Sequence, residues 1–432
     1  MLIAHQIELD VTLTQDAYFR RACGTARFVW NWALAEWNRQ YEAGLRPNAL
    51  ALKKQFNALK YSEHPWMKDI HRDAHSQPFA NLSKAWGKFF DDIKNGKDAH
   101  RPVFKKKGKA RDSFYVANDK MDVGERHVRL PVIGRIKLKE RPRFGGKLMG
   151  ASVRRDGTRW FLSLQMEVNV SWIDGGTRRA VTGVDVNVKE VVCSDGKRFE
   201  SPRPLEKARR KLERLQRSVS RKVEAQKVRM GLPKNGRIPK GTRLLASKNR
   251  EKASRKLADQ HRKIRCIRND FTHKMTSEIA RKNHTVVIED LSVKGMTASA
   301  KGTAAEPGKR VRQKAGLNRA ILDVAFGEIG RQIKYKSAWY GTTVVEADRF
   351  FPSSKRCSCC GEVNADLALK HRSWTCKACG TTHDRDFNAS VNLEQVVGLP
   401  EAIGKVTPGQ KRLPQSGRSG QEPEHVCTRF AP

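Results

Sequence analysis

Apolar residues recur at every third or fourth position in two stretches near the N-terminus. The first stretch carries Phe19, Ala22, Cys23, Ala26, Trp30, Ala33 and Trp37, and the second carries Phe79, Leu82, Trp86, Phe89, Phe90 and Ile93. This spacing places the apolar side chains on one face of an α-helix. We therefore predict two helices that pack their aromatic faces together in a small helical domain. We assign these aromatic residues to its core and not to the stacking of bases.

A different pattern, alternation of apolar and polar residues, follows the helices. It covers residues 127–132, 134–139, 151–155 and 160–168. Turn residues such as Gly134 and the pair Asp156-Gly157 separate these segments, as expected for short antiparallel strands. The alternation predicts a small β-barrel or sheet, completed by an N-terminal strand in residues 3–13.

The second half of the chain combines buried strands with long helices. Strands are predicted at residues 181–186, 189–193, 197–200, 285–291 and 342–346, and a helix through residues 321–339. Leu205, Ala208, Leu212, Leu215 and Val219, and again Ile264, Ile267, Phe271, Met275 and Ile279, keep the helical spacing. These two stretches predict a helical hairpin with a strongly basic outer face, joined by an exposed connection at residues 229–250.

Charge narrows the class of partner. The 432 residues hold 86 Lys and Arg against 45 Asp and Glu, a net charge of +41. Such an excess destabilises a compact fold by self-repulsion unless a polyanion is bound, and phosphate contacts release counterions. Nucleic acid is therefore the predicted partner, and charge alone leaves open a protein that only coats nucleic acid. No run of 18 apolar residues and no signal-peptide pattern occur, so we expect a cytoplasmic protein without a membrane partner.

Four cysteines near the C-terminus have the spacing of a zinc ribbon. Cys357-x-x-Cys360 and Cys376-x-x-Cys379 are separated by fifteen residues, which is typical of a structural Zn²⁺ site. Cys359 lies between two of these residues and could take the place of one of them as a ligand, although steric economy favours the outer pair. The remaining cysteines are scattered without a pattern, which favours a reducing compartment.

Three acidic residues interrupt predicted elements of structure. Asp185 lies inside the strand 181–186, Glu289 near the end of the strand 285–291, and Asp386 just beyond the second cysteine pair. One buried carboxylate alone is readily a satisfied structural residue, but three together repel one another unless a cation binds. Oxygen ligands select Mg²⁺ or Mn²⁺, and two such ions about 4 Å apart support phosphodiester hydrolysis. A meander, a later strand and a final helix that each supply one carboxylate suit an RNase H-like fold.

The motifs GVDVNVKEVV, VIEDL and FPSSKRCSCCG…WTCKACGTTHDRDFNASVNL resemble the RuvC-like nuclease core of the TnpB family. The resemblance continues through GTARFVWNWAL, RPVFKKK and KSAWYG, and so covers nearly the whole chain except its tail. TnpB proteins are transposon-encoded, RNA-guided nucleases related to type V CRISPR effectors. In the position of Asn187 the family usually has glycine.

The resemblance implies an α/β multidomain protein: a RuvC-like nuclease core with an inserted zinc ribbon, and a wedge-like β-barrel with an inserted helical recognition domain. The implied boundaries are 1–14 and 104–172 for the barrel, 15–103 for the recognition domain, 180–354 and 381–395 for the nuclease, 355–380 for the ribbon, and 396–432 for a disordered tail.

The resemblance also implies which residues act. Asp185, Glu289 and Asp386 match the catalytic, Mg²⁺-binding triad, with Asp386 preferred to Asp384 because it precedes the segment Phe-Asn-Ala. The four outer cysteines match the Zn²⁺ ligands. Gln77 lies near positions that contact the target-adjacent motif, and Lys105, Lys106 and Lys107 are predicted to bind nucleic acid.

The implied partners are a guide RNA encoded at the transposon end and double-stranded target DNA. The implied activity is RNA-guided DNA cleavage. One alternative is a nuclease-inactive, RNA-guided repressor, against which the presence of all three carboxylates argues. A transposase that joins strands by itself is a weaker alternative, because the chain shows no tyrosine nucleophile beside a paired-histidine motif.

Overall fold

The computed structural model describes residues 2–143, 145–168, 177–239, 241–245, 247–368 and 370–409. Two compact units divide the chain: Met1–Val170 with Lys211–Lys263, and Ser171–Arg210 with Ile264–Pro432. The helices α4 (Pro204–Arg229) and α5 (Lys248–Lys282) contribute residues to both units. None of the described helices is long and apolar enough to cross a lipid bilayer.

An antiparallel sheet of seven strands, in the order β2-β6-β7-β1-β5-β4-β3, organises the first unit. Its strands are β1 (Leu2–Asp10), β2 (Ser113–Ala117), β3 (Asp122–Val123), β4 (His127–Leu130), β5 (Gly134–Leu138), β6 (Lys147–Asp156) and β7 (Arg159–Glu167). Alternate residues of β1, among them Ile3, Ile7 and Leu9, are buried. The N-terminal strand therefore joins the later strands, as the alternation of apolar residues predicts.

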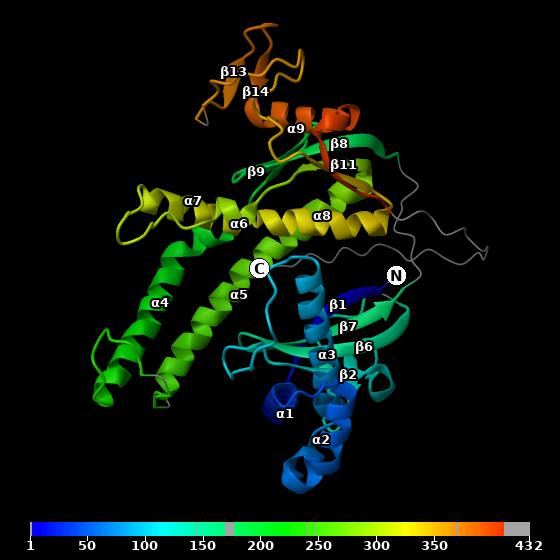
Figure 1. Cartoon of the computed structure of the whole chain (residues 1–432), viewed down its shortest axis with the longest axis vertical. Coiled ribbons are helices and arrows are strands. Elements are labelled where there is room, and N and C mark those ends of the chain that lie inside the picture. Colours follow the sequence, from blue (N-terminus) through cyan, green and yellow to red (C-terminus); the bar gives the residue numbers. More distant parts are fainter. Residues whose placement is uncertain are drawn as a thin grey trace, which may run out of the picture. The chain divides into compact units, whose positions relative to one another are not determined.

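Three helices are inserted in the chain between β1 and β2 (Figure 1). They are α1 (Leu13–Glu42), α2 (Ala49–Glu63) and α3 (Arg72–Lys94). Trp30 and Ala33 of the predicted face of α1 share one core with α3 and with Leu52 and Phe56 of α2. Phe19 instead packs against Phe114 and Trp160 of the sheet. Phe90 and Ile93 are exceptions, because their side chains are 54% and 55% exposed. The prediction that they belong to the core is therefore wrong.

A six-stranded sheet in the order β10-β9-β8-β11-β12-β15 organises the second unit. Its strands are β8 (Arg179–Val186), β9 (Glu190–Cys193), β10 (Arg198–Glu200), β11 (Asn283–Glu289), β12 (Thr343–Ala347) and β15 (Ile403–Thr407). β8, β11 and β12 run parallel, while β9, β10 and β15 are antiparallel to their neighbours. This parallel centre brings the carboxyl ends of three strands to one edge of the sheet.

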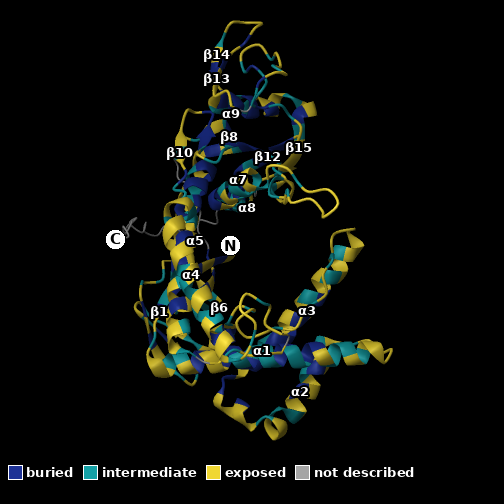
Figure 2. Ribbon diagram, turned by 90° about the vertical axis from the view of Figure 1, so that its left-hand side faces the viewer, coloured by how far each residue is buried: buried dark blue, intermediate teal, exposed yellow. Residues whose placement is uncertain are grey.

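Helices cover both faces of this sheet (Figure 1). Residues of α5, α7 (Val311–Val324) and α8 (Phe326–Tyr340) pack on one face against Val184, Val286 and Val344. The helix α9 (Arg385–Gln395) packs on the other face with Val287 and Val345. Figure 2 shows buried residues concentrated in the sheets and in the helices that cover them, while α4 is exposed along much of its length.

Two predictions made from the sequence for this unit are wrong. The helix predicted through residues 321–339 is two helices, because Ala325 adopts a left-handed conformation with φ of 64°. Residues 396–407, predicted to be disordered, form two 3₁₀ turns and the strand β15, which pairs with β12. Hydrogen bonds to a sheet edge stabilise this segment despite its Gly- and Pro-rich composition. The rest of the predicted tail, residues 410–432, lies outside the described residues.

Candidate functional site

Two of the predicted carboxylates lie side by side at the carboxyl edge of the parallel strands. Val184 of β8 is paired with Ile288 of β11, so the next residues, Asp185 and Glu289, are neighbours in the register. Residues two apart on a strand share a face. Because Gly183 and Val287 face α9, Asp185 and Glu289 face the same side as this helix.

The third carboxylate, Asp386, lies in the first turn of α9, the helix on that face. The preceding acid, Asp384, is the N-cap of the helix, and its Oδ1 accepts a hydrogen bond of 2.8 Å from the backbone N–H of Phe387. The side chain of Asp384 therefore caps the N-terminus of the helix. This division of roles agrees with the choice of Asp386 over Asp384 made from the motif.

Asp185 lies close enough to the other two carboxylates for their charges to act on it. Burial raises the pKa of Asp185 well above its usual value, and the negative charges of Glu289 and Asp386 raise it further. Burial also raises the pKa of Glu289 and of Asp386. Two neighbours hold single oxygens: the amide of Asn187 donates to Oδ2 of Asp185, and the hydroxyl of Ser353 donates to Oε1 of Glu289 at 2.7 Å.

This donor set suits a hard divalent cation. Buried carboxylates that destabilise one another's ionised forms gain most from a neutralising ion, and their oxygens are the ligands of Mg²⁺ and Mn²⁺. The basic groups that act on the site, Arg372 and Arg385, offset only part of this charge: Arg372 Nη1 lies 3.6 Å from Oδ1 of Asp386. Within residues 2–409 as described, the four cysteines are the one group already close enough to hold an ion without rearrangement.

The sulfur atoms of Cys357, Cys360, Cys376 and Cys379 all lie within 4.8 Å of one another. Two of the separations, between Cys357 and Cys379 and between Cys360 and Cys376, are 3.6 Å. Tetrahedral zinc with Zn–S bonds of about 2.3 Å requires sulfurs about 3.8 Å apart, so the cluster fits Zn²⁺. Cys359 is exposed and outside the group, which agrees with the outer pair as ligands.

Polar side chains that sequence reasoning missed connect the cysteine cluster to α9. Asn388 donates to the carbonyl of Arg356 at 2.8 Å and accepts from the backbone N–H of Ser358 at 3.0 Å. One turn later, Asn392 donates to the carbonyl of Ser353 at 2.8 Å. Both asparagines are buried. The helix that carries Asp386 is thus fixed to the segment that enters the ribbon. Their spacing of four residues places both on one face of α9 but does not show what they bind.

The close packing of α9 on β8 depends on Gly183. A Cβ atom on Gly183 would lie less than 3.0 Å from backbone atoms of Ser390 and Glu394. We expect Gly183→Ala to move α9 and to lower the free energy of unfolding by about 1–3 kcal/mol, the usual cost of overpacking. Thermal unfolding measures this effect. Gly330→Ala is the matched control, since no atom lies within 4 Å of its added Cβ. Equal stability of the two variants would contradict the packing argument.

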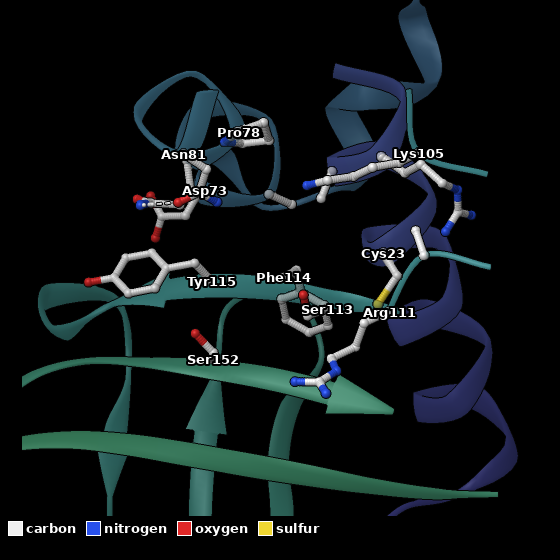
Figure 3. Close-up of a pocket in the computed structure, with 15 residues that line it drawn as sticks. Cys23, Asp73, Pro78, Asn81, Lys105, Arg111, Ser113, Phe114, Tyr115 and Ser152 are labelled. Carbon is white, nitrogen blue, oxygen red and sulfur yellow. Dashed lines mark hydrogen bonds between the residues drawn. The ribbon is translucent and has the colours of Figure 1, made fainter. Parts of the chain in front are cut away.

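A small cavity of about 90 Å³ lies in the first unit between α1, α3 and the sheet. In Figure 3, Asp73 and Asn81 of α3 lie across it from Tyr115 of β2 and Ser152 of β6. Gln77 also lines it. The cavity therefore combines hydrogen-bond donors and acceptors from a helix and a sheet.

The three predicted lysines of the basic loop differ in their surroundings. Lys105 is half-buried: its Nζ lies 3.7 Å from the centre of the Trp30 ring, and Asn31 binds its backbone N–H and carbonyl. Burial and the nearby Arg27 lower the pKa of Lys105. Lys106 and Lys107 are exposed. Lys105 thus anchors the loop, and its two neighbours present their charges to solvent.

A basic groove of about 920 Å³ runs along the second half of α4 in the first unit. Arg214, Arg217 and Arg221 line it at helical spacing, together with Arg229 and Lys234. Glu224 also lines it, but its carboxylate binds Lys227 and the backbone N–H of Asn235. Across the described residues, no acidic partner is found for Arg214, Arg217 or Arg221. The predicted basic face of the hairpin is therefore present.

The sequence is similar to curated proteins over almost its full length. It is 32% identical over 418 residues to the "Putative RNA-guided DNA endonuclease InsQ" of Escherichia coli strain K12, and covers 97% of that protein and 96% of this chain. It is 31% identical over 428 residues to a "Putative RNA-guided DNA endonuclease" of Streptomyces pristinaespiralis, and covers 94% of that protein and 95% of this chain.

Family models match three parts of the chain: a helix-turn-helix domain at residues 1–46, a probable transposase at 166–300 and a Cas12f1-like TNB domain at 326–393. Residues 2–42 form β1 and the single long helix α1, apart from a short link. A solved structure of CasPhi-2 (Cas12j) bound to crRNA and phosphorothioate-DNA is a distant likeness. The matched region covers 94% of this chain and 92% of the CasPhi-2 chain, with a TM-score of 0.40 and 11% sequence identity.

Proposed function

The chain belongs to the TnpB family of transposon-encoded proteins, and from this premise we propose that it is an RNA-guided DNA endonuclease. Its substrate is double-stranded DNA next to a short target-adjacent motif, and its reaction is metal-dependent phosphodiester hydrolysis. The guide is an RNA encoded at the transposon end. The retained carboxylates Asp185, Glu289 and Asp386 argue against a nuclease-inactive repressor.

The observation that carries the proposal is that Asp185 and Glu289 occupy neighbouring strand positions at the carboxyl edge of the six-stranded sheet, while Asp386 lies in the first turn of the helix on that face. The strand order, with an antiparallel meander β10-β9-β8 followed by parallel β11 and β12, is that expected of an RNase H-like nuclease core. Asp185 on β8, Glu289 on β11 and Asp386 on α9 then supply one carboxylate each. The raised pKa of Asp185, to which the charges of the other two carboxylates contribute, supports their acting as one group.

Each residue of the site has a proposed part. The three carboxylates would hold Mg²⁺ or Mn²⁺, which when bound activates water and stabilises the leaving oxygen. Ser353 and Asn187 each bind one oxygen, of Glu289 and of Asp185 respectively, and the second oxygen of each carboxylate would be available as a ligand. Cys357, Cys360, Cys376 and Cys379 would hold Zn²⁺ as a structural ion.

The first unit supplies surfaces for nucleic acid. We assign the seven-stranded sheet to the wedge-like domain and α1 to α3 to the recognition domain. Gln77 at the small cavity is proposed to contact the target-adjacent motif, and Lys106 and Lys107 to contact phosphates. Lys105 supports this loop from its place over Trp30.

The proposal is tested with the purified protein and the RNA that copurifies with it. The RNA is sequenced, a DNA that matches its guide segment is prepared, and cleavage is measured with and without Mg²⁺. We expect only the DNA that matches the guide segment to be cleaved. Stable binding of the matched DNA without any product would favour the repressor.

The groove on α4 gives a prediction about binding of the RNA. We expect the double substitution Arg217→Ala with Arg221→Ala to weaken RNA binding and to reduce the slope of log affinity against log salt by about 1.4–1.8, because each phosphate contact contributes about 0.7–0.9. Filter binding at several salt concentrations measures the slope. Arg331→Ala is the control, since its guanidinium on α8 binds Glu328. An unchanged slope in the double variant excludes the groove as a phosphate-binding surface.

A further inference from the structure

Phe350 is a nearly fully exposed aromatic residue close to the carboxylates. Its side chain is 88% exposed, more than any other phenylalanine among the exposed large hydrophobic residues. It follows β12, whose last residue, Ala347, is paired with Glu289. Single exposed apolar residues are common on protein surfaces, so exposure alone assigns no function. Two further observations point to a function: the position of the loop beside Glu289 and the contacts that hold its backbone in place.

The loop that carries Phe350 begins and ends beside Glu289. Ala347 lies next to Glu289 in the sheet, and Ser353 donates to Oε1 of Glu289 at 2.7 Å. Phe350 is three residues from each of these anchors. Since an extended chain advances at most about 3.6 Å per residue, its Cα lies within about 11 Å of both. A base near the phosphate held at the carboxylates is therefore within reach of the ring.

Contacts on both sides of Phe350 fix the loop. Its backbone N–H donates to Oδ1 of Asp348 at 2.9 Å. The guanidinium of Arg349 binds the carboxylate of Asp290. Phe351 is turned inward and packs against the core that includes Val345 and Leu393. The exposed ring thus projects from a backbone that is held in place, so little conformational entropy is lost when a ligand binds.

We propose that Phe350 is a stacking site for an unpaired nucleobase of the DNA strand that enters the carboxylate site. This inference rests on the proposed function, since it concerns the strand to be cut. An aromatic face stacks on any base, so the site selects single-stranded DNA and not a sequence. Its effect is to hold the strand so that the phosphate to be cut stays near the three carboxylates. The hydrogen bond between Ser353 and Glu289 limits how far the loop can move from the site.

The first test compares cleavage by the full chain with its copurified RNA. We expect Phe350→Ala and Phe350→Leu each to lower kcat/KM for DNA cleavage roughly tenfold to a hundredfold, in line with the value of one base stacked on an aromatic ring. Phe350→Trp should keep kcat/KM close to that of the unaltered protein, because tryptophan stacks on a base and leucine does not. Leu322→Ala is the control: it removes an apolar side chain of a residue that is 54% exposed on α7 in the same unit, and cleavage should be unchanged.

The second test reads stacking without cleavage. The substitution Asp185→Asn is combined with each Phe350 variant, and 2-aminopurine is placed at successive positions around the cleavage site in the target DNA. Stacking quenches this base. At one position its fluorescence should therefore be low with the native phenylalanine or with Phe350→Trp, and higher with Phe350→Ala or Phe350→Leu. Circular dichroism checks that the variants remain folded.

The outcomes separate the inference from the proposed function. If the unaltered protein cuts DNA while Phe350→Ala and Phe350→Leu cut equally well and leave the fluorescence unchanged, the stacking site is overturned and the nuclease remains. Failure of Phe350→Trp to restore cleavage and quenching also overturns it, because the loop then needs phenylalanine for its own structure. If the unaltered protein never cuts but quenching depends on Phe350, the proposed function fails and the stacking site stands.

Discussion

Asp185→Asn is expected to lower DNA cleavage by at least about a thousandfold while RNA and DNA binding stay close to those of the unaltered protein. The substitution removes one of the three carboxylates that we propose to hold the divalent ion but keeps the shape of the side chain. Metal coordination contributes several kcal/mol to the stability of the transition state, and each ~1.4 kcal/mol is a factor of ten. Single-turnover cleavage and gel-shift measurements on the same samples separate the two properties.

The same substitution should make the metal-free protein more stable at neutral pH. The pKa of Asp185 in the folded protein is raised above its usual value by burial and by the charges of Glu289 and Asp386. The fold therefore prefers the protonated carboxyl, and this stability is full below the unfolded-state pKa and is lost as the pH rises through the folded one. The amide introduced by Asp185→Asn cannot ionise, so the melting temperature of this variant should fall less between about pH 4 and pH 7.

Asp195→Asn is the control for both measurements. Asp195 is an exposed residue in the turn between β9 and β10, and its Oδ1 accepts from the backbone N–H of Lys197, a bond that asparagine keeps. Cleavage and melting temperature should both be unchanged. A variant Asp185→Asn that cut matched DNA at the normal rate would remove the assignment of the site.

Patterns of apolar residues predicted the central strands of the sheets more reliably than the edge strands. The strands β8 and β11 are buried on both faces and contain runs such as Val286, Val287 and Ile288. The edge strand β15 has Gly404 and Lys405 among five residues and gave no such signal. Its place is set by pairing with β12, which is distant in the sequence. Propensity is a weak guide where tertiary hydrogen bonds decide the structure.

The break between α7 and α8 shows the same limit. Ala325 is a good helix former, and nothing in its neighbours predicts a left-handed residue. The two helices bury Val324 and Phe326 on either side of the break, so the packing of the sheet face fixes the turn. The helix α2 was missed because only Leu52 and Phe56 of its fifteen residues are buried.

The carboxylates and cysteines of the candidate site were proposed from motifs, but the polar side chains that support them were not. Ser353, Asn388 and Asn392 make contacts to residues 30–64 positions away, and no local pattern reports such distances. For Lys105, the motif predicted a role that its surroundings in the structure change. A run of lysines predicted three equivalent phosphate contacts, whereas Trp30 and Asn31 turn the first of them into an anchor.

Loss of zinc should remove cleavage through the helix that carries Asp386. The ribbon has a small core, in which Leu367 and Trp374 pack with Cys357 and Cys376, so most of its folding free energy would come from the Zn²⁺ ion that we propose. Its entry segment is bound by Asn388 and Asn392 of α9. A ribbon without zinc therefore releases these bonds and moves the first turn of α9, where Asp386 lies.

Cys360→Ser is therefore expected to lower zinc content and to reduce cleavage on the order of a hundredfold or more, and limited proteolysis should cut between residues 357 and 379. Cys359→Ser is the matched control, one residue away and outside the cluster, and it should keep zinc, resistance to protease and activity. Metal analysis, proteolysis and cleavage are measured on the same preparations. If Cys360→Ser lost its zinc and still cut DNA at the full rate, the ribbon would have no part in positioning Asp386.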